Sequence, residues 1–216
     1  MDTTRFAREI ERLRTRLAHP LPGTEAQFTM APRYRRDETL ADVRGKPCRQ
    51  AGVLALLVPH TAGAPAILLT VRRDHLARHA GQVSFPGGRL EPGESHVAAA
   101  LRETHEEVGI DPASVDVLGP LTPLYIPPSN YCVYPFVGAV YAPPDLRPHD
   151  DEVAAVLAVP LTHLLDPSTR RCTPWTLRGR TVEVPFFEVE GHRVWGATAM
   201  MLAELLAVYA EATSPA

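Results

Sequence analysis

The amino-acid sequence predicts an α/β fold built on a mixed β-sheet. Short apolar, β-prone runs are spread along most of the chain, one amphipathic helix follows directly on a glycine-rich loop, and an apolar helix ends the chain. The 216 residues suffice for one domain of ordinary size with a substantial core. The 45% hydrophobic and 22% charged fractions are typical of globular proteins.

Composition and charge exclude several classes of function. With a net charge of −3, the chain lacks the excess of basic residues that is typical of nucleic-acid-binding proteins. No apolar run approaches the roughly 18 residues needed to span a bilayer, and no secretory signal begins the chain. Cys48, Cys132 and Cys172 are odd in number and have no metal-ligand spacing, which favours a reducing compartment. We therefore expect a cytoplasmic protein with no nucleic-acid and no membrane partner.

The chain begins with an amphipathic helix, expected over residues 2–18. Its apolar side chains fall on one stripe: Phe6, Ile10, Leu13 and Leu17. That stripe can cover the domain's own surface or meet a second subunit, so a homodimer stays open. A connector rich in proline and arginine follows over residues 20–47. We divide the chain into an N-terminal helix and connector, 1–49, and a main domain, 50–213.

Two strands and a basic loop come next. Residues 52–58 and 66–71 are apolar and β-prone, and a Pro/Gly loop separates them. The following loop gathers four cationic side chains: Arg72, Arg73, Arg78 and His79. Guanidinium groups bind phosphate in a bidentate manner, so this loop is a candidate anion-binding site, although a solvated basic loop explains the same residues. Further on, Gly87 and Gly88 allow the backbone to approach a metal ion or phosphate closely.

The helix after the glycine-rich loop is defined at both ends. Ser95 is a typical N-cap, and Gly109 stands just past the last turn. At about 100° per residue, one stripe of the helix faces a core: Val97, Leu101, Thr104 and Val108. The opposite arc gathers one arginine and three glutamates: Arg102, Glu103, Glu106 and Glu107.

That acidic cluster weakens the helix unless something else stabilises it. Like charges one turn apart cost about 0.2–0.5 kcal/mol per pair, and exposed glutamates near a helix C-terminus oppose the macrodipole by about 0.3–1 kcal/mol each. A solvated acidic face is the ordinary explanation of a charge run. A divalent cation such as Mg²⁺ or Mn²⁺ would remove the repulsion, because clustered carboxylates are the ligands that such ions accept. Glu103 and Glu107 lie one turn apart and can converge on one point.

The second half of the chain completes the predicted sheet. Strands are expected over residues 115–118, 121–126, 131–141, 153–161, 173–177 and 182–189. A turn at 127–130 and a short helix at 161–165 interrupt them. A final helix begins near Trp195, and we interpret it as a core helix with Thr198 near its start.

The acidic helix and the loop before it resemble the Nudix box. The matching positions are Gly88, Glu94, Arg102-Glu103, Glu106-Glu107 and Gly109-Ile110, separated by five, seven, two and one residues. Thr104 departs from the pattern, since the family has an aliphatic residue there, and this change concerns packing. The resemblance implies a Nudix-type α/β/α sandwich with a mixed sheet. It also implies hydrolysis of a pyrophosphate bond that links a nucleoside phosphate to another group.

The same resemblance assigns roles to individual residues. The metal ligands would be Glu103, Glu106, Glu107 and the Gly87 carbonyl, with Mg²⁺ or Mn²⁺ as the ion. Arg102 and Glu94 would orient these ligands by ion pairing. The substrate phosphates would be bound by Arg72, Arg73, Arg78, His79, Gly87 and Gly88. The base that deprotonates water stays open among Glu103, Glu106 and Glu152, and Glu152 is equally well explained as a surface acid at the start of a strand.

A narrower resemblance concerns coenzyme A pyrophosphatases. Leu68-Leu69-Thr70, the basic loop and Phe85-Pro86-Gly87-Gly88 are similar to the motif that precedes the Nudix box in that sub-family, although Arg73 and Ala77 depart from it. Trp195-Gly196-Ala197-Thr198-Ala199 is similar to a later run. This implies cleavage of coenzyme A, or a CoA derivative, to 3′,5′-ADP and 4′-phosphopantetheine. The alternatives are a Nudix hydrolase of another nucleoside diphosphate derivative, such as ADP-ribose, and a non-catalytic ligand-sensing Nudix domain.

Overall fold

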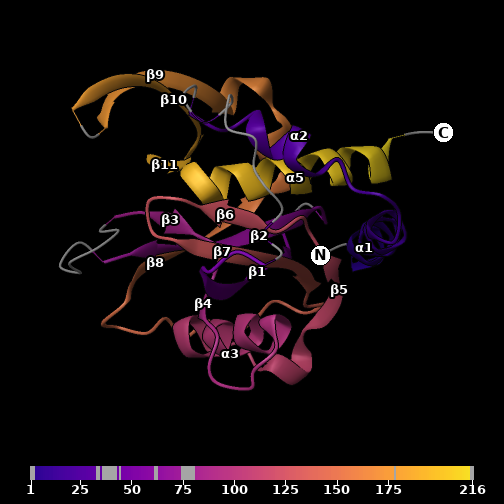
Figure 1. Ribbon diagram of the computed structural model, residues 1–216. Coiled ribbons are helices and arrows are strands. Elements are labelled where there is room, and N and C mark those ends of the chain that lie inside the picture. The colour runs from indigo at the N-terminus through magenta and orange to yellow at the C-terminus, as the bar shows by residue number, and fades with distance from the viewer. Residues whose placement is uncertain are drawn as a thin grey trace.

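The computed structural model describes residues 3–32, 35, 43, 45–60, 63–73, 81–177 and 179–214. A large mixed sheet forms its middle layer (Figure 1). Helix α3 (His96–Val108) covers one face of this sheet, and helices α1 (Thr3–Leu17) and α5 (Gly196–Thr213) lie on the other side. The predicted α/β fold with a mixed sheet between helical layers is therefore confirmed.

The central strand of the sheet is β1 (Arg49–Pro59). It runs parallel to β7 (Tyr131–Ala139) and antiparallel to β2 (Pro65–Arg72) and β4 (Gly87–Arg89). In the described part of the chain this sheet has eight strands, ordered β3-β2-β1-β7-β5, with β4, β6 and β8 paired to β1, β7 and β2. The remaining strands are β3 (Val83–Ser84), β5 (Asp116–Pro120), β6 (Leu124–Ile126) and β8 (Val153–Pro160).

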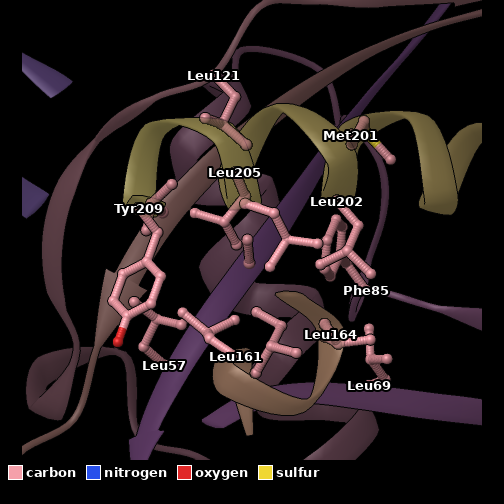
Figure 2. Close-up of a cluster of buried hydrophobic side chains, with 14 of the residues drawn as sticks. Leu57, Leu69, Phe85, Leu121, Leu161, Leu164, Met201, Leu202, Leu205 and Tyr209 are labelled. Atoms are coloured by element: carbon pink, nitrogen blue, oxygen red, sulfur yellow. The ribbon is translucent and has the colours of Figure 1, made fainter. Parts of the chain in front are cut away.

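Each face of the sheet has its own hydrophobic core. On the α3 side, Leu54, Leu56 and Leu68 pack against Ala100 and Val108 of the helix. On the other side, Figure 2 shows Leu202, Leu205 and Tyr209 of α5 beside Leu57 and Leu69 of the sheet. This second core also contains Leu161 and Leu164 of the short helix α4 (Leu161–Leu165), which was predicted at this position. The alternating side chains of single strands thus supply both cores.

The apolar stripe of α1 is buried within the same chain. Phe6, Ile10 and Leu13 are almost fully buried in the core that α5 shares with the sheet. Helix α1 contacts α5 and β5 along this stripe. Of the two alternatives left open by the sequence, packing on the domain's own surface is therefore the one that the structure shows.

Several short elements were not predicted, among them the strands β3 and β4 described above. Within the connector, a short helix α2 (Gly23–Phe28) packs against α5. The strands expected over 173–177 and 182–189 are β9 (Arg170–Leu177) and β10 (Arg180–Val189), which pair as a hairpin. A third strand, β11 (His192–Trp195), pairs with β10 in a second, three-stranded sheet. Figure 1 shows β9 and β10 curving away above α5, while β11 leads directly into that helix. Two short 3-10 helices complete the structure, η2 (Pro112–Ser114) and η3 (Pro167–Thr169).

A disulfide joins Cys48, just before β1, to Cys132 in β7. The expectation of reduced cysteines did not foresee this bond. It follows from the parallel pairing of β1 and β7, which sets Gln50 opposite Cys132. Cys172 is exposed on β9 and takes no part in the bond. Within the described ranges, no helix has both the length and the hydropathy needed to cross a membrane.

Candidate active site

Helix α3 has the predicted bounds and caps. The Ser95 hydroxyl accepts a hydrogen bond from the Ala98 N–H at 3.2 Å, and Gly109 ends the helix in the left-handed region at φ 78°. Thr104 is fully buried, and its hydroxyl donates to the Ala100 carbonyl at 2.6 Å. The threonine that departs from the family pattern therefore satisfies its hydroxyl within its own helix, as expected of a packing position.

The orientation of α3 differs from the prediction at one residue that matters for chemistry. The buried residues of the helix are Ala99, Ala100, Thr104, Glu107 and Val108. Glu107 was placed with Glu103 and Glu106 on the arc opposite the core-facing stripe, and this is wrong, since Glu107 is only 9% exposed. Val97 and Leu101 are half-buried instead. The helix is turned so that one carboxylate of the acidic cluster faces the sheet.

Glycines on the facing strands allow this close packing. A Cβ on Gly52 would lie 2.0 Å from the carbonyl oxygen of His96, and a Cβ on Gly87 would lie 2.4 Å from the carbonyl oxygen of Gly52. A Cβ on Gly88 would lie 2.3 Å from the carboxyl carbon of Glu103. Gly52 was not predicted as a site residue, although a glycine inside an apolar strand is a signal of close backbone approach.

Arg102 ties the other carboxylates together. Its guanidinium binds Glu94 in a bidentate manner at 2.9 and 3.1 Å and donates to Glu103 at 3.0 Å and to Glu106 at 3.1 Å. It also donates to the Arg89 carbonyl at 3.0 Å. These hydrogen bonds raise the pKa of Arg102 and lower that of Glu94. Arg102 is thus a permanent cation that fixes the position of three carboxylates.

Glu107 is the least satisfied carboxylate of the group. Its Oε2 is buried and has no hydrogen-bond partner in the described structure, whereas the backbone N–H of Gly87 donates to the carboxylate. Burial raises the pKa of Glu107 to about 8. The negative charges of Glu103 and Glu152 raise it as well, and the Arg72 guanidinium opposes them. A buried acceptor of this kind needs either a proton or a cation.

Glu103 and Glu152 complete the acidic group. Burial raises the pKa of Glu103 in spite of its hydrogen bond from Arg102, and the charges of Glu106 and Glu152 raise it further. Glu152 stands in the turn before β8, and its carbonyl accepts a hydrogen bond from the Arg73 N–H at 3.0 Å. The structure therefore brings Glu152, predicted with two alternative roles, into the electrostatic field of Glu103 and Glu107.

The donor set fits a divalent cation of the Mg²⁺ type. The orphan Oε2 of Glu107 and the neighbouring charge of Glu103 supply oxygen ligands in a half-buried setting. In the ranges that the structure describes, no three His, Cys, Asp or Glu side chains are already converged as a complete metal shell. The Arg102 hydrogen bonds account for this, because they hold Glu103 and Glu106 toward the guanidinium.

The predicted phosphate-binding residues are placed only in part. Arg72 ends β2, and its charge acts on Glu107. Arg73 follows it, and its Nε is buried without a hydrogen-bond partner among the described residues, as is the Nε of Arg72. Arg78 and His79 lie outside the described residues. Thus Arg72 is the cation of the predicted loop that the structure brings to the carboxylates.

A cavity of about 390 Å³ adjoins this site and was not predicted. Arg72 and Gly87 form part of its lining, as do Arg35 from the connector and Tyr131 from β7. Residues at the junction of β11 and α5 form a further wall: Trp195, Gly196, Ala197 and Thr198. The sequence interpretation of this junction as the start of a core helix is therefore incomplete. A cavity assembled from segments so far apart leaves no local signal in the sequence.

Comparison with known proteins gives a consistent result. Residues 47–176 match the model of the NUDIX domain. The chain is 43% identical over 160 residues to the uncharacterized Nudix hydrolase NudL of Escherichia fergusonii, covering 73% of this chain and 81% of that protein. The NudL protein of Escherichia coli K12 is 42% identical with the same coverage. Among solved structures, a MutT/nudix family protein from Enterococcus faecalis has a TM-score of 0.51 at 16% identity, over 80% of this chain and 64% of that one.

Proposed function

The chain belongs to the NUDIX domain family, and we propose that within it the protein is a metal-dependent hydrolase of coenzyme A or a CoA derivative. The reaction would break the pyrophosphate bond and release 3′,5′-ADP and 4′-phosphopantetheine. The observation that carries the hydrolase assignment is Glu107, a buried carboxylate with an orphan oxygen beside Glu103, Glu152 and Arg72. A buried carboxylate with an unpaired oxygen lowers the stability of the fold. It is useful where the site binds a cation.

The ligands of the ion would be Glu103, Glu106 and Glu107, with the Gly87 carbonyl as a further oxygen. The chemistry that bound Mg²⁺ or Mn²⁺ supplies in such a site is charge neutralisation on the pyrophosphate oxygens and activation of water. Glu106 is half-exposed and forms an ion pair with Arg102. Glu107 is held in place by the Gly87 N–H and by the packing of α3.

The remaining residues orient this group and accept a proton. Glu94 and Arg102 form a bidentate pair that fixes the carboxylates of Glu103 and Glu106. Arg72, with Arg73 beside it, would bind the diphosphate. The water that attacks phosphorus loses its proton to a carboxylate, and Glu103, Glu106 and Glu152 are the candidates for this base.

The coenzyme A specificity is supported by the sequence motifs that flank the site. Leu68-Leu69-Thr70 and Phe85-Pro86-Gly87-Gly88 lead into the acidic helix, and the Trp195–Ala199 run adjoins the same site through the cavity. ADP-ribose is the competing substrate, because its hydrolysis needs the same carboxylates and differs only in the group beyond the diphosphate.

The test is a product assay with purified protein. Coenzyme A is incubated with Mg²⁺ and, separately, with Mn²⁺, and the products are separated by ion-exchange chromatography. Release of 3′,5′-ADP that stops on addition of a chelator is the expected result. Cleavage of ADP-ribose or a dinucleotide polyphosphate with no 3′,5′-ADP from coenzyme A would overturn the substrate assignment. Failure to cleave any of these compounds with either metal would overturn the hydrolase assignment.

A further inference from the structure

We propose that the cavity beside Arg72 and Gly87 is the subsite for the base of the nucleotide, and that Trp195 is the surface on which this base stacks. The inference deepens the proposed function and rests on it, because it requires a nucleoside phosphate as one half of the substrate. Apart from Arg72, the residues that line this cavity lie outside the acidic helix and the basic loop.

The position of the cavity is the first argument. Its lining includes Arg72 and Gly87, and these are also the two residues whose charge and N–H act on Glu107. A ligand whose diphosphate lies at the carboxylates can therefore enter the cavity without crossing open surface. The volume of about 390 Å³ lies within the range of small-molecule sites, roughly 300–1,000 Å³.

The aromatic wall is the second argument. Trp195 lines the cavity and is half-buried. The ring of Trp175 packs edge-on against it, with centroids 4.9 Å apart and planes at 69°. The Arg193 guanidinium lies over Trp175 at 5.8 Å from its centroid. The indole of Trp195 is thus held in a fixed orientation, which lowers the entropic cost of stacking a planar ligand on it.

The rest of the lining suits a base better than a flexible chain. Tyr131 adds a second aromatic ring, which Arg49 covers at 4.7 Å from its centroid. Hydroxyl and amide groups stand among apolar side chains in the lining and can hydrogen-bond ring heteroatoms: Gln82, Ser84, Ser129 and Thr198. The 4′-phosphopantetheine half has no π-face and many rotatable bonds, so two ordered aromatic rings offer it little. The nucleoside half is therefore the better occupant.

The experiment uses two probes, AMP and ribose 5-phosphate, which has a hydroxyl at C1 where AMP has the base. Neither contains a pyrophosphate bond, so binding is measured without turnover, by calorimetry with the full chain and Mg²⁺. Both tryptophans of the chain belong to this aromatic wall, so AMP should also change the intrinsic fluorescence. We expect AMP to bind at least tenfold more tightly than ribose 5-phosphate.

Variants at position 195 then assign the difference to the indole. Trp195→Leu keeps apolar bulk without a π-face, and it should weaken AMP binding by about 5- to 150-fold, the range that base–aromatic stacking implies. Its affinity for ribose 5-phosphate should not change. Trp195→Phe should restore most of the AMP affinity. Tyr141→Ala removes an exposed aromatic ring outside the cavity lining and serves as the control, with unchanged AMP binding. Circular dichroism checks that each variant is folded.

The outcomes separate this inference from the proposed function. Equal binding of AMP and ribose 5-phosphate would overturn the subsite, and so would a folded Trp195→Leu variant that binds AMP as tightly as the wild type. Either result is compatible with cleavage of coenzyme A. Conversely, if coenzyme A is not cleaved while Trp195→Leu removes the preference for AMP, the substrate assignment fails and the base subsite stands.

Discussion

Two buried glutamates on opposite faces of the sheet have contrasting surroundings. Glu204 of α5 is fully buried and accepts hydrogen bonds from the Gln27 amide at 2.8 Å, the Thr122 hydroxyl at 2.6 Å and the Thr122 N–H at 3.1 Å. Glu107 of α3 is nearly as buried, yet the Gly87 N–H is its hydrogen-bond donor within the described structure and its Oε2 has none. Burial raises the pKa of both carboxyls.

The difference separates a structural carboxylate from one that is available to a ligand. Around Glu204, the donors come from α2 and from the segment before β6, so one side chain ties three parts of the chain together. Of the three charged side chains that act on Glu107, two are acidic, Glu103 and Glu152, and one is the cation Arg72. Burial alone therefore does not identify a functional group. The number of hydrogen-bond donors around a buried carboxylate distinguishes the functional group from the structural one.

The variant Glu107→Gln is the strongest test of the proposed difference between Glu107 and Glu204. The neutral amide removes a ligand of the proposed metal site, and we expect turnover of coenzyme A to fall by about 10²–10³-fold, the loss that follows removal of one such electrostatic contact. Steady-state kinetics with Mg²⁺ measures this loss. The free energy of unfolding should not fall, because the variant no longer buries an ionisable group with an orphan oxygen.

Two controls belong to that variant. Mg²⁺ without substrate should raise the unfolding temperature of the wild type and leave that of Glu107→Gln unchanged, since a ligand that binds only the folded state stabilises it. Circular dichroism verifies the fold. Near-normal turnover by Glu107→Gln would refute its role as a ligand and leave the orphan oxygen without a function.

Glu204→Ala should give the opposite pattern. It leaves buried donors of Gln27 and Thr122 without an acceptor, and we expect a loss of about 2–4 kcal/mol in the free energy of unfolding. Urea unfolding measures this loss. At a temperature where the variant is folded, turnover should stay within a few-fold of the wild type. A stable Glu204→Ala with strongly reduced turnover would contradict the structural role.

The variant Gly88→Ala tests whether the acidic group on α3 needs Glu103 in a fixed position. A Cβ here would meet the Glu103 carboxyl carbon at 2.3 Å, so Glu103 must move away from its place. Because a displacement of about 1 Å in a catalytic group can cost 10²-fold, we expect turnover to fall by about 10- to 100-fold. Gly93→Ala is a matched control, since a Cβ there meets nothing within 4 Å, although its φ of 82° will cost some stability. Equal turnover of the two variants would argue against a fixed position for Glu103.

The smallest expected effect is the pH dependence of stability that Glu204 contributes. Because its native pKa lies above the ordinary carboxyl value of 4.5, the folded state binds the proton more tightly than the unfolded state. Relative to Glu204→Gln, the wild type should therefore be most stable below about pH 4.5 and lose stability as the pH rises through the raised native pKa. Urea unfolding of both proteins from pH 4 to 8 tests this. Parallel curves would show that Glu204 keeps an ordinary pKa.

Local signals in the sequence predicted the elements of the site well. Ser95 and Gly109 bound α3 as expected, and the apolar stripe of α1 is buried as a unit. The orientation of Glu107 was missed, because it depends on Gly52, which packs against the helix backbone, and on the Gly87 N–H, which donates to the carboxylate. Both glycines reach these positions only after the strands pair. The cavity was missed for a similar reason, since Arg35, Arg72 and Trp195 come from distant segments and show no common periodicity. The helical period predicts which residues share one face of a helix. Tertiary contacts then decide how the helix is rotated, and so which residues at the border of that face are buried.

The disulfide between Cys48 and Cys132, which are 84 residues apart in the sequence, closes the chain between them into a covalent ring. That ring contains all of α3 together with Arg72 and Gly87. A backbone break in the segment 90–95 would therefore leave two fragments that migrate as one molecule until a reductant is added. New chain termini can accordingly be introduced beside the acidic helix without the two halves diffusing apart.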